Sequence, residues 1–213
     1  MDAPTYRRFA PGDPTPRVGL VLWDLGGVVV DVDLDRGRAE LLRRTGRDVF
    51  EAAFFDPETR LKERLDRGEL TAEAGLNALQ ERLGVAPVDA IAAWNAVLTV
   101  RPEVTALILA LAVPVGVISN ADPVHAAFIR ANAGIDSVVQ HWTWSYEHRA
   151  MKPDAALFER ALEVHDAAPP EVLLIDDRED NVAAALALGM DAVRYTTPSD
   201  LHLALRARGL ALP

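Results

Sequence analysis

Short apolar runs recur along the chain, and stretches with helical spacing follow most of them. Short apolar runs bounded by turn residues are typical of strands that are buried on both faces. Strands that alternate with helices predict a parallel sheet covered by helices on both sides, which is an α/β fold. The expected strands are residues 18–23, 113–118, 138–144, 172–175 and 191–195.

Helix ends are marked between the last four of these strands. Pro123 follows Asp122 and predicts a helix start, and Gly134 predicts the end of the same helix. Pro153 predicts a second start, and Gly189 predicts the end of the helix that follows the segment "DDREDN".

Residues 34–101 break the alternation, because nothing in them resembles a strand. A plain crossover is far shorter than this segment. Thr71 is placed to cap one helix that Gly84 ends, and Pro102 stops a second helix. We expect an all-helical insert over the carboxyl ends of the strands, within a core of residues 18–33 and 102–213. The apolar stripes of the two helices are Leu76, Leu79 and Leu83, and Ile91, Trp94, Val97 and Leu98.

Composition narrows the possible partners. A net charge of −10 and a pI of about 4.9 argue against nucleic acid or an anionic membrane as the main partner. A bound metal can invert the local field, so an anionic small substrate stays compatible. The chain has no cysteine, and no apolar run approaches the ~20 residues of a membrane span. Residues 1–17 contain four prolines and no apolar signal segment, so we expect a loose leader on a cytoplasmic protein. The sequence does not indicate the oligomeric state.

Chemically reactive residues stand at the ends of three expected strands. Asp24 follows the first, Ser119 and Asn120 follow the second, and the pair Asp176 and Asp177 follows the fourth. Lys152 stands just before the helix that Pro153 opens. Because the ligand crevice of a parallel sheet lies outside the carboxyl ends of its strands, we expect these groups to converge there.

Each residue type has a role in phosphate chemistry. An aspartate can attack a phosphoryl group and form an aspartyl-phosphate, and Asp24 is placed to do so. The carboxylates of Asp24, Asp176 and Asp177 form an oxygen-rich set that suits Mg²⁺. The hydroxyl of Ser119 and the ammonium of Lys152 can hold phosphate oxygens as charge builds up.

Two smaller observations support this interpretation. Gly26 and Gly27 allow the backbone to approach a metal and a phosphate closely. The chain has twenty arginines but only two lysines, Lys62 and Lys152. A lysine retained in such a composition indicates a need for a compact point charge that a planar guanidinium does not supply.

Taken singly, these residues have ordinary structural explanations. An aspartate after a strand often caps a helix or forms a turn, a Ser-Asn pair forms a turn, and a lysine lies on the surface. Asp180 and Asn181 are expected to cap and solvate the next helix. The functional interpretation depends on all four groups occurring in one order at the strand ends.

That order resembles the four motifs of the haloacid dehalogenase (HAD) superfamily. The segments "WDLGGVVVD", "VISNADPVH", "MKPDAALFERAL" and "LIDDREDNVAAALALGM" are similar to subfamily IA, particularly its glucose-1-phosphatase-like branch. The resemblance implies a Rossmann-like three-layer core with a helical cap and Mg²⁺-dependent hydrolysis of a small phosphorylated metabolite. The site residues that it implies are Asp24 as nucleophile, Asp24, Asp176, Asp177 and the Gly26 carbonyl as metal ligands, and Gly26, Gly27, Ser119, Asn120 and Lys152 around the phosphoryl group.

One departure from the superfamily pattern concerns the proton for the leaving group. Most of its phosphatases carry a second aspartate two positions after the nucleophile, where this chain has Gly26. Loss of a general acid typically costs ~10²–10⁴-fold in rate. Asp31 is a candidate substitute, although a solvating role in a hairpin explains it as well. His125 is expected on the helix surface, with contact to substrate as the alternative.

Other functions stay open at this point. A haloacid dehalogenase also lacks the second aspartate, but its chemistry needs no metal, so the Asp176-Asp177 pair would be hard to explain. A phosphonoacetaldehyde hydrolase uses a lysine of the cap, and Lys62 lies in the insert, within a segment that reads as a solvated helix. A sugar phosphomutase needs the acid that Gly26 lacks, and a receiver domain has its acidic pair at the first strand. A non-catalytic binding protein of the same fold is the remaining alternative.

Overall fold

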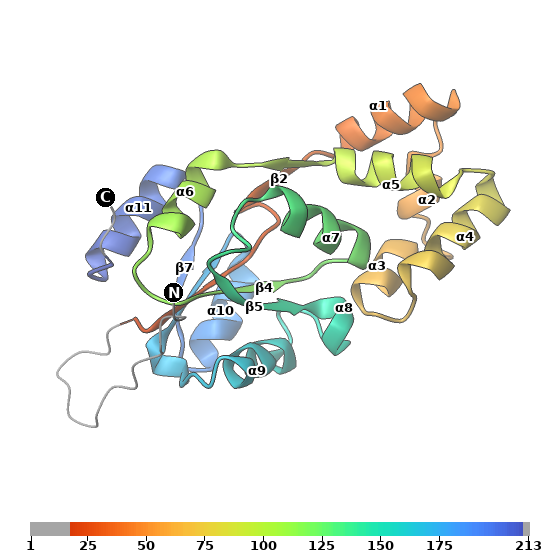
Figure 1. The fold of residues 1–213 in the computed structure, drawn as a ribbon. Helices are drawn as coiled ribbons and strands as arrows, with labels where there is room; N and C mark the ends of the chain where they lie inside the picture. Colours follow the sequence, from red (N-terminus) through yellow and green to blue (C-terminus); the bar gives the residue numbers. More distant parts are fainter. Residues whose placement is uncertain (1–17, 211–213) are drawn as a thin grey trace.

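The computed structural model describes residues 18–210, and a five-stranded parallel sheet lies at their centre (Figure 1). Across the sheet the strands lie in the order 139–144, 115–119, 20–23, 172–176 and 191–194, so the first strand of the chain lies in the middle of the sheet. The expected α/β fold is confirmed, and each of the five expected strands is present. Their bounds are Leu20–Trp23 (β1), Val115–Ser119 (β4), Val139–Trp144 (β5), Val172–Asp176 (β6) and Asp191–Arg194 (β7).

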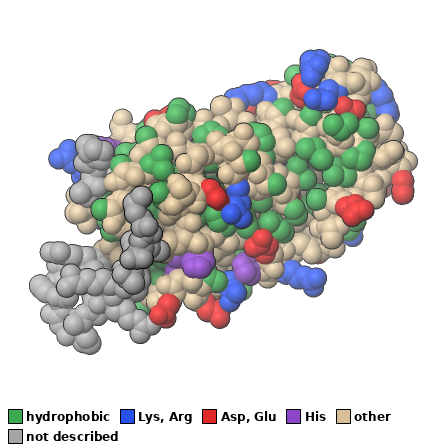
Figure 2. Space-filling view, in the orientation of Figure 1, with side chains coloured by type: hydrophobic (Ala, Val, Ile, Leu, Met, Phe, Trp, Pro, Cys, Tyr) green, Lys and Arg blue, Asp and Glu red, His purple; other side chains and the backbone are tan. Residues whose placement is uncertain are grey.

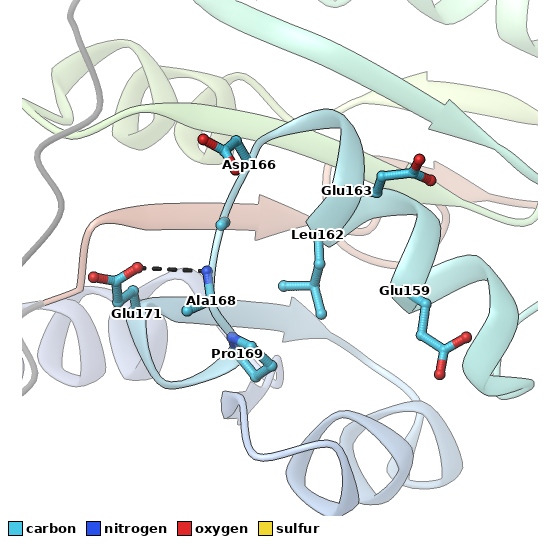
Figure 3. Close-up of a pocket in the computed structure, with 8 residues that line it drawn as sticks. Glu159, Leu162, Glu163, Asp166, Ala168, Pro169 and Glu171 are labelled. Atoms are coloured by element: carbon cyan, nitrogen blue, oxygen red, sulfur yellow. Dashed lines mark hydrogen bonds between the residues drawn. The ribbon is translucent and has the colours of Figure 1, made fainter.

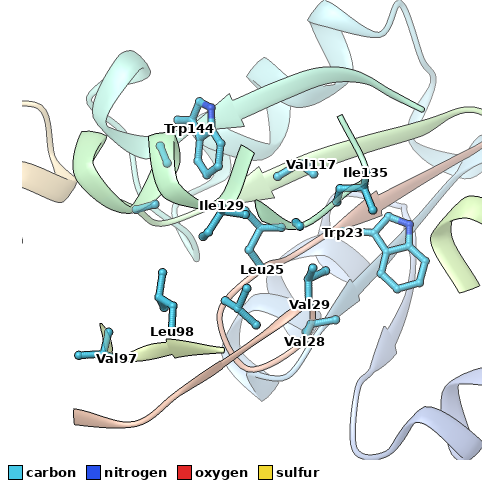
Figure 4. Packing of buried hydrophobic residues seen from close by; sticks show 14 of the residues in the cluster. Trp23, Leu25, Val28, Val29, Val97, Leu98, Val117, Ile129, Ile135 and Trp144 are labelled. Atoms are coloured by element: carbon cyan, nitrogen blue, oxygen red, sulfur yellow. The ribbon is translucent and has the colours of Figure 1, made fainter. Parts of the chain in front are cut away.

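Helices cover both faces of the sheet. Side chains alternate between the faces along each strand, so these apolar strands present hydrophobic side chains on both sides. On β1, Val21 and Trp23 pack in one hydrophobic cluster with residues of the helices 102–110 (α6), 123–132 (α7) and 198–207 (α11). Leu20 and Leu22 pack in the other cluster with residues of the helices 155–164 (α9) and 179–187 (α10). Figure 4 shows Trp23 and Val117 of the first cluster with Ile129 of α7. The result is a three-layer core. Its helices are Pro102–Ala110 (α6), Pro123–Asn132 (α7), Ser145–His148 (α8), Ala155–Val164 (α9), Glu179–Ala187 (α10) and Pro198–Ala207 (α11), with the 3₁₀ turn Pro169–Glu171 (η1).

A group of helices, which we call the helical insert, spans residues 34–96 and lies at one end of the molecule (Figure 1). As expected, the Thr71 hydroxyl caps the helix of residues 72–83 (α4) by accepting from Ala74 N at 3.2 Å, and Gly84 ends α4 in the left-handed conformation. Leu79 of its apolar stripe is buried. The insert helices are Leu34–Thr45 (α1), Phe50–Phe54 (α2), Leu61–Asp66 (α3), Ala72–Leu83 (α4) and Pro87–Ala96 (α5).

The expectation that nothing in residues 34–101 forms a strand is wrong. Leu98–Val100 forms β3, which pairs antiparallel with β2, Val30–Val32. Val97 and Leu98 therefore continue past the end of α5 instead of extending its apolar stripe. The cause is a pairing between segments far apart in the chain, which no local pattern of apolar residues announces.

The surface carries charges of both signs. On the face shown in Figure 2, acidic and basic side chains are interspersed, and hydrophobic side chains gather over the helical insert. Val88 of α5 and Leu42 of α1 are exposed hydrophobic residues of the helical insert. Within residues 18–210, no helix has the length and apolar character needed to cross a membrane.

Candidate active site

The central strands bring the first pair of carboxylates together. β1 and β6 are parallel neighbours, with Trp23 opposite Ile175 in the ladder. Asp24 continues the pairing, since its backbone N–H donates to the Ile175 carbonyl at 2.9 Å. Asp24 and Asp176 are therefore side by side at the carboxyl edge of the sheet, and both are buried.

Lys152 bridges these two carboxylates from the loop before α9. Its Nζ lies 2.9 Å from Asp24 Oδ1 and 2.6 Å from Asp176 Oδ2, and it donates to the Ile118 carbonyl at 2.9 Å. An ammonium has three hydrogens, so these three acceptors use all of them. Lys152 therefore fixes the candidate nucleophile through Oδ1, and its contact with a phosphoryl oxygen stays a prediction.

Two asparagines hold this arrangement in place. The Asn120 amide donates to the Lys152 carbonyl and accepts from the Lys152 backbone N–H, each at 2.8 Å. The Asn181 amide donates to both oxygens of Asp176, at 2.9 and 3.1 Å. The expectation that Asn181 solvates a helix is wrong, because Asn181 is buried against the site. Asp180 does have a surface role, since its carboxylate pairs with Arg178.

Asp177 contributes the third carboxylate and is half-buried. One oxygen atom from each of Asp24, Asp176 and Asp177 lies within 4.8 Å of the other two. Gly27 makes room for this carboxylate, because a Cβ on Gly27 would lie 2.3 Å from Asp177 Oδ2. The φ of Gly27 is +79°, a conformation that residues with a side chain rarely adopt. The glycine at position 27 is therefore needed on two counts.

The three carboxylates are not balanced by the one lysine. Burial raises the pKa of Asp24 to about 6, with Lys152 lowering it and Asp176 raising it further. Burial also raises the pKa of Asp177, and the charge of Asp176 adds to the effect. For Lys152, the two aspartates outweigh burial and raise the ammonium pKa, so the lysine stays charged. The site therefore favours an additional cation.

The donor set fits a hard divalent cation such as Mg²⁺. Carboxylate oxygens are its preferred protein ligands. Asp176 already accepts from Lys152, Asn181 and the Arg178 backbone, which leaves Asp24 and Asp177 as the carboxylates that would hold the ion. Asn181 Oδ1 is buried and has no hydrogen-bond partner among the described residues, and a bound ion with its water would supply one.

A cleft of about 590 Å³ opens over these groups. The residues that line it from the core include Asp24, Gly26, Gly27, Asn120, Lys152 and Asp177, together with Arg178, whose guanidinium is paired with Asp180. Lys62 and Asp66 line it from the helical insert. Ser119, which ends β4, is buried and is not one of the described residues that line the cleft. The volume is in the range of small-molecule sites.

A larger hollow of about 690 Å³ lies at the other end of β6, beside η1. Figure 3 shows Glu159 and Glu163 on α9, with Glu171 accepting from Ala168 N at 3.4 Å. This hollow lies at the amino end of β6, whereas Asp176 lies at its carboxyl end. The 590 Å³ cleft, which contains the carboxylates and Lys152, is therefore the candidate active site.

The position of the missing acid is sterically open. A Cβ on Gly26 would lie 3.8 Å from Val32 Cγ2, which is an ordinary contact, and Gly26 does not have a positive φ. Asp31, the candidate substitute, lines the cleft but faces two guanidinium groups, Arg36 at 3.2 Å and Arg101 at 3.1 Å.

The expectation that His125 lies on the surface is wrong. Its ring stacks on Trp94 of the helical insert with centroids 4.5 Å apart, and burial lowers its pKa. Trp94 Nε1 donates to Asp122 Oδ2 at 2.8 Å, and Asp122 also caps α7. His125 thus belongs to the contact between the helical insert and α7. In the sequence, the apolar face of α5, which includes Trp94, was the feature that indicated such a contact.

Comparison with known proteins agrees with this geometry. Residues 18–189 match the family described as haloacid dehalogenase-like hydrolase. The chain belongs to this family. The family indicates an enzyme, and specifically a hydrolase.

Several solved structures share the HAD fold. A HAD family enzyme from Bacteroides thetaiotaomicron is 25% identical, with a TM-score of 0.78 over 88% of this chain and 98% of that one. A complex of that enzyme with magnesium and inorganic phosphate is 24% identical, with a TM-score of 0.74 over 84% and 94%. The L-2-haloacid dehalogenase from Xanthobacter autotrophicus, with chloropropionic acid covalently bound, is 20% identical, with a TM-score of 0.60 over 91% and 84%.

Proposed function

We propose that this HAD hydrolase is a Mg²⁺-dependent phosphatase that acts on a small phosphorylated metabolite. The observation that carries the proposal is the excess of negative charge: three clustered carboxylates face one lysine. A dehalogenase reaction needs no metal and gives no reason for this excess. Binding of a divalent cation together with a phosphate ester does explain the excess of carboxylates.

In the proposed reaction, Asp24 attacks the phosphorus atom and the bond to the leaving oxygen breaks. Water then hydrolyses the aspartyl-phosphate and regenerates Asp24. When bound, Mg²⁺ would offset the charges of the phosphate and the carboxylates. Lys152 holds Asp24 in place, Asn120 holds the Lys152 loop, and Asn181 holds Asp176. The phosphoryl contacts proposed for the Ser119 hydroxyl and for the backbone at Gly26 and Gly27 belong to the same scheme, in which the Gly26 carbonyl would be a ligand of the metal ion.

Within the superfamily we place the chain in subfamily IA, near the glucose-1-phosphatase-like branch. The support is the segment "WDLGG", which lacks the second aspartate, and the helical insert between β2 and β3, which would be the cap. Without an acid at Gly26, the rate should depend on the acidity of the leaving group. Aryl and anomeric phosphates should therefore react faster than primary alkyl phosphates.

The test is phosphate release from 4-nitrophenyl phosphate with Mg²⁺, with EDTA, and with the variant Asp24→Asn. We expect activity in the first case only. Full activity in EDTA would contradict the proposal.

A second candidate is a dehalogenase, favoured by the absence of an acid at Gly26 and by the structural likeness to the Xanthobacter enzyme. Chloride release from 2-chloropropionate without metal, in the absence of phosphatase activity, would establish it instead.

A further inference from the structure

Both lysines of the chain line the same cleft. Lys152 lies on the core side, and Lys62 lies on the insert side in α3. The helix that carries Lys62 is therefore solvated only in part, since Lys62 faces the cleft. Lys62 is paired with Asp66, one helical turn further along α3, and the Lys62 side chain is 35% exposed. An ammonium with one partner among the described residues keeps donors for a ligand in the cleft.

Asp66 is placed to hold that ammonium. It lines the cleft, its side chain is 5% exposed, and its Oδ1 is buried without a hydrogen-bond partner among residues 18–210. A buried oxygen without a partner costs free energy, so its presence calls for an explanation. Burial raises the pKa of Asp66 to about 6, with Lys62 lowering it and Asp122 raising it. At neutral pH the carboxylate is ionised and balances the charge of Lys62.

We propose that Lys62 is the residue of the insert that contacts the leaving group, that Asp66 positions it, and that the leaving group is neutral and rich in hydroxyls. A lysine only donates hydrogen bonds, so its ligand must offer acceptor oxygens. The charge of Lys62 is already balanced by Asp66. A second anionic group on the substrate would therefore gain little binding free energy from Lys62, and it would be repelled by the Asp66 carboxylate. Hydroxyl oxygens, as in a sugar or another polyol phosphate, accept from Lys62 without that repulsion.

The inference rests on the proposed phosphatase function, and the substrates of the test separate the two. Three phosphate esters of equal carbon length are compared with Mg²⁺ present: glycerol 1-phosphate, propyl phosphate and 3-phosphoglycerate. The variant Lys62→Met removes the charge and keeps the length of the side chain. Arg43→Met, in α1 and 67% exposed, is the matched control outside the cleft. Circular dichroism establishes that each variant is folded.

We expect Lys62→Met to lower kcat/KM for glycerol 1-phosphate by at least about 10-fold, since a hydrogen bond to a charged group is lost. For propyl phosphate, which lacks the hydroxyls, we expect a change of less than about 2-fold. Equal losses on both esters, or no loss on either, would overturn the assignment of Lys62. A wild-type preference for 3-phosphoglycerate that Lys62→Met abolishes would overturn the neutral leaving group.

Asp66 is tested by selectivity, which a merely structural role would not shift. Asp66→Asn leaves Lys62 unbalanced, so 3-phosphoglycerate should gain about 5-fold or more relative to glycerol 1-phosphate. Asp66→Glu should restore the wild-type ratio, and an unchanged ratio in Asp66→Asn would overturn the positioning role. If the wild-type enzyme releases no phosphate even from 4-nitrophenyl phosphate, the proposed function fails and this inference with it. Activity on the aryl ester with no dependence on Lys62 overturns only the inference.

Discussion

Lys152 on the core side of the cleft and Lys62 on the insert side are both paired with aspartates, but the two pairs differ in burial. The side chain of Lys152 is 1% exposed and has three oxygen partners, two of them carboxylates. The side chain of Lys62 is 35% exposed and is paired with Asp66 alone in the part of the chain that the structure describes. A fully buried ammonium with three acceptors therefore holds the two carboxylates in place, whereas a partly exposed ammonium with one carboxylate partner keeps hydrogen-bond donors available.

The largest expected effect is on the core side. Lys152→Met leaves Asp24 and Asp176 buried without their cation, and removal of one partner from a buried pair costs about 3–5 kcal/mol. We expect the free energy of unfolding, measured in urea, to fall by that amount. Lys152→Arg should keep more stability but lose at least ~10-fold in kcat/KM, because a planar guanidinium cannot reproduce the three contacts of the ammonium. An unchanged unfolding free energy in Lys152→Met would remove the contrast between the two lysines.

Binding of Mg²⁺ should give the next largest effect. At a Mg²⁺ concentration of 100 times the dissociation constant, the free energy of unfolding should rise by about 2.7 kcal/mol. Thermal unfolding with Mg²⁺ and with EDTA measures the difference. Asp177→Asn should abolish the shift, because it removes a proposed ligand, whereas Asp66→Asn on the insert side should keep it. A shift that survives in Asp177→Asn would place the ion elsewhere.

Two neighbouring glycines of the core side provide a matched pair of variants. Gly27→Ala should destabilise the protein by about 1–3 kcal/mol and weaken the Mg²⁺ shift, since its Cβ meets Asp177 Oδ2 and its φ is positive. Gly26→Ala should cost less than about 1 kcal/mol, because its Cβ meets only Val32 at 3.8 Å. Chemical denaturation of both variants, with and without Mg²⁺, tests the prediction. Equal costs would mean that the contact with Asp177 is not what requires a glycine.

The smallest effect is expected on the insert side. Lys62→Met should cost about 1 kcal/mol at pH 7, where Asp66 is ionised and loses its partner. The cost should shrink towards zero at pH 5. The pKa of Asp66 is about 6, above its ordinary value, so at pH 5 the carboxylate carries its proton in both proteins and the ion pair is absent from both. Urea denaturation at the two pH values measures the difference. A cost that is constant with pH would mean that Asp66 is not the partner that matters.

Much of the fold and part of the candidate site follow from local patterns. The apolar runs predict the five strands, and Pro123, Gly134 and Gly189 predict helix ends that the structure contains. Asp24 and Asp176 come directly after apolar runs, so their place at the carboxyl edge follows from the parallel topology. These features depend on residues that are neighbours in the chain, and for that reason the sequence determined them.

The remaining features were decided by contacts between distant segments. β3 exists because Leu98–Val100 meets β2, and His125 is buried because Trp94 of the insert stacks on it. Asn181 belongs to the site because the first turn of α10 faces Asp176, although an amide five residues after a carboxylate was a weak sign of it. The pairing of Lys152 with two carboxylates, and the presence of Lys62 and Asp66 at the same cleft, depend on how the helical insert and the loop before α9 meet the sheet. The sequence supplies these charges, but their burial and partners arise only when the chain is packed, because charge energies depend on surroundings that local sequence does not specify.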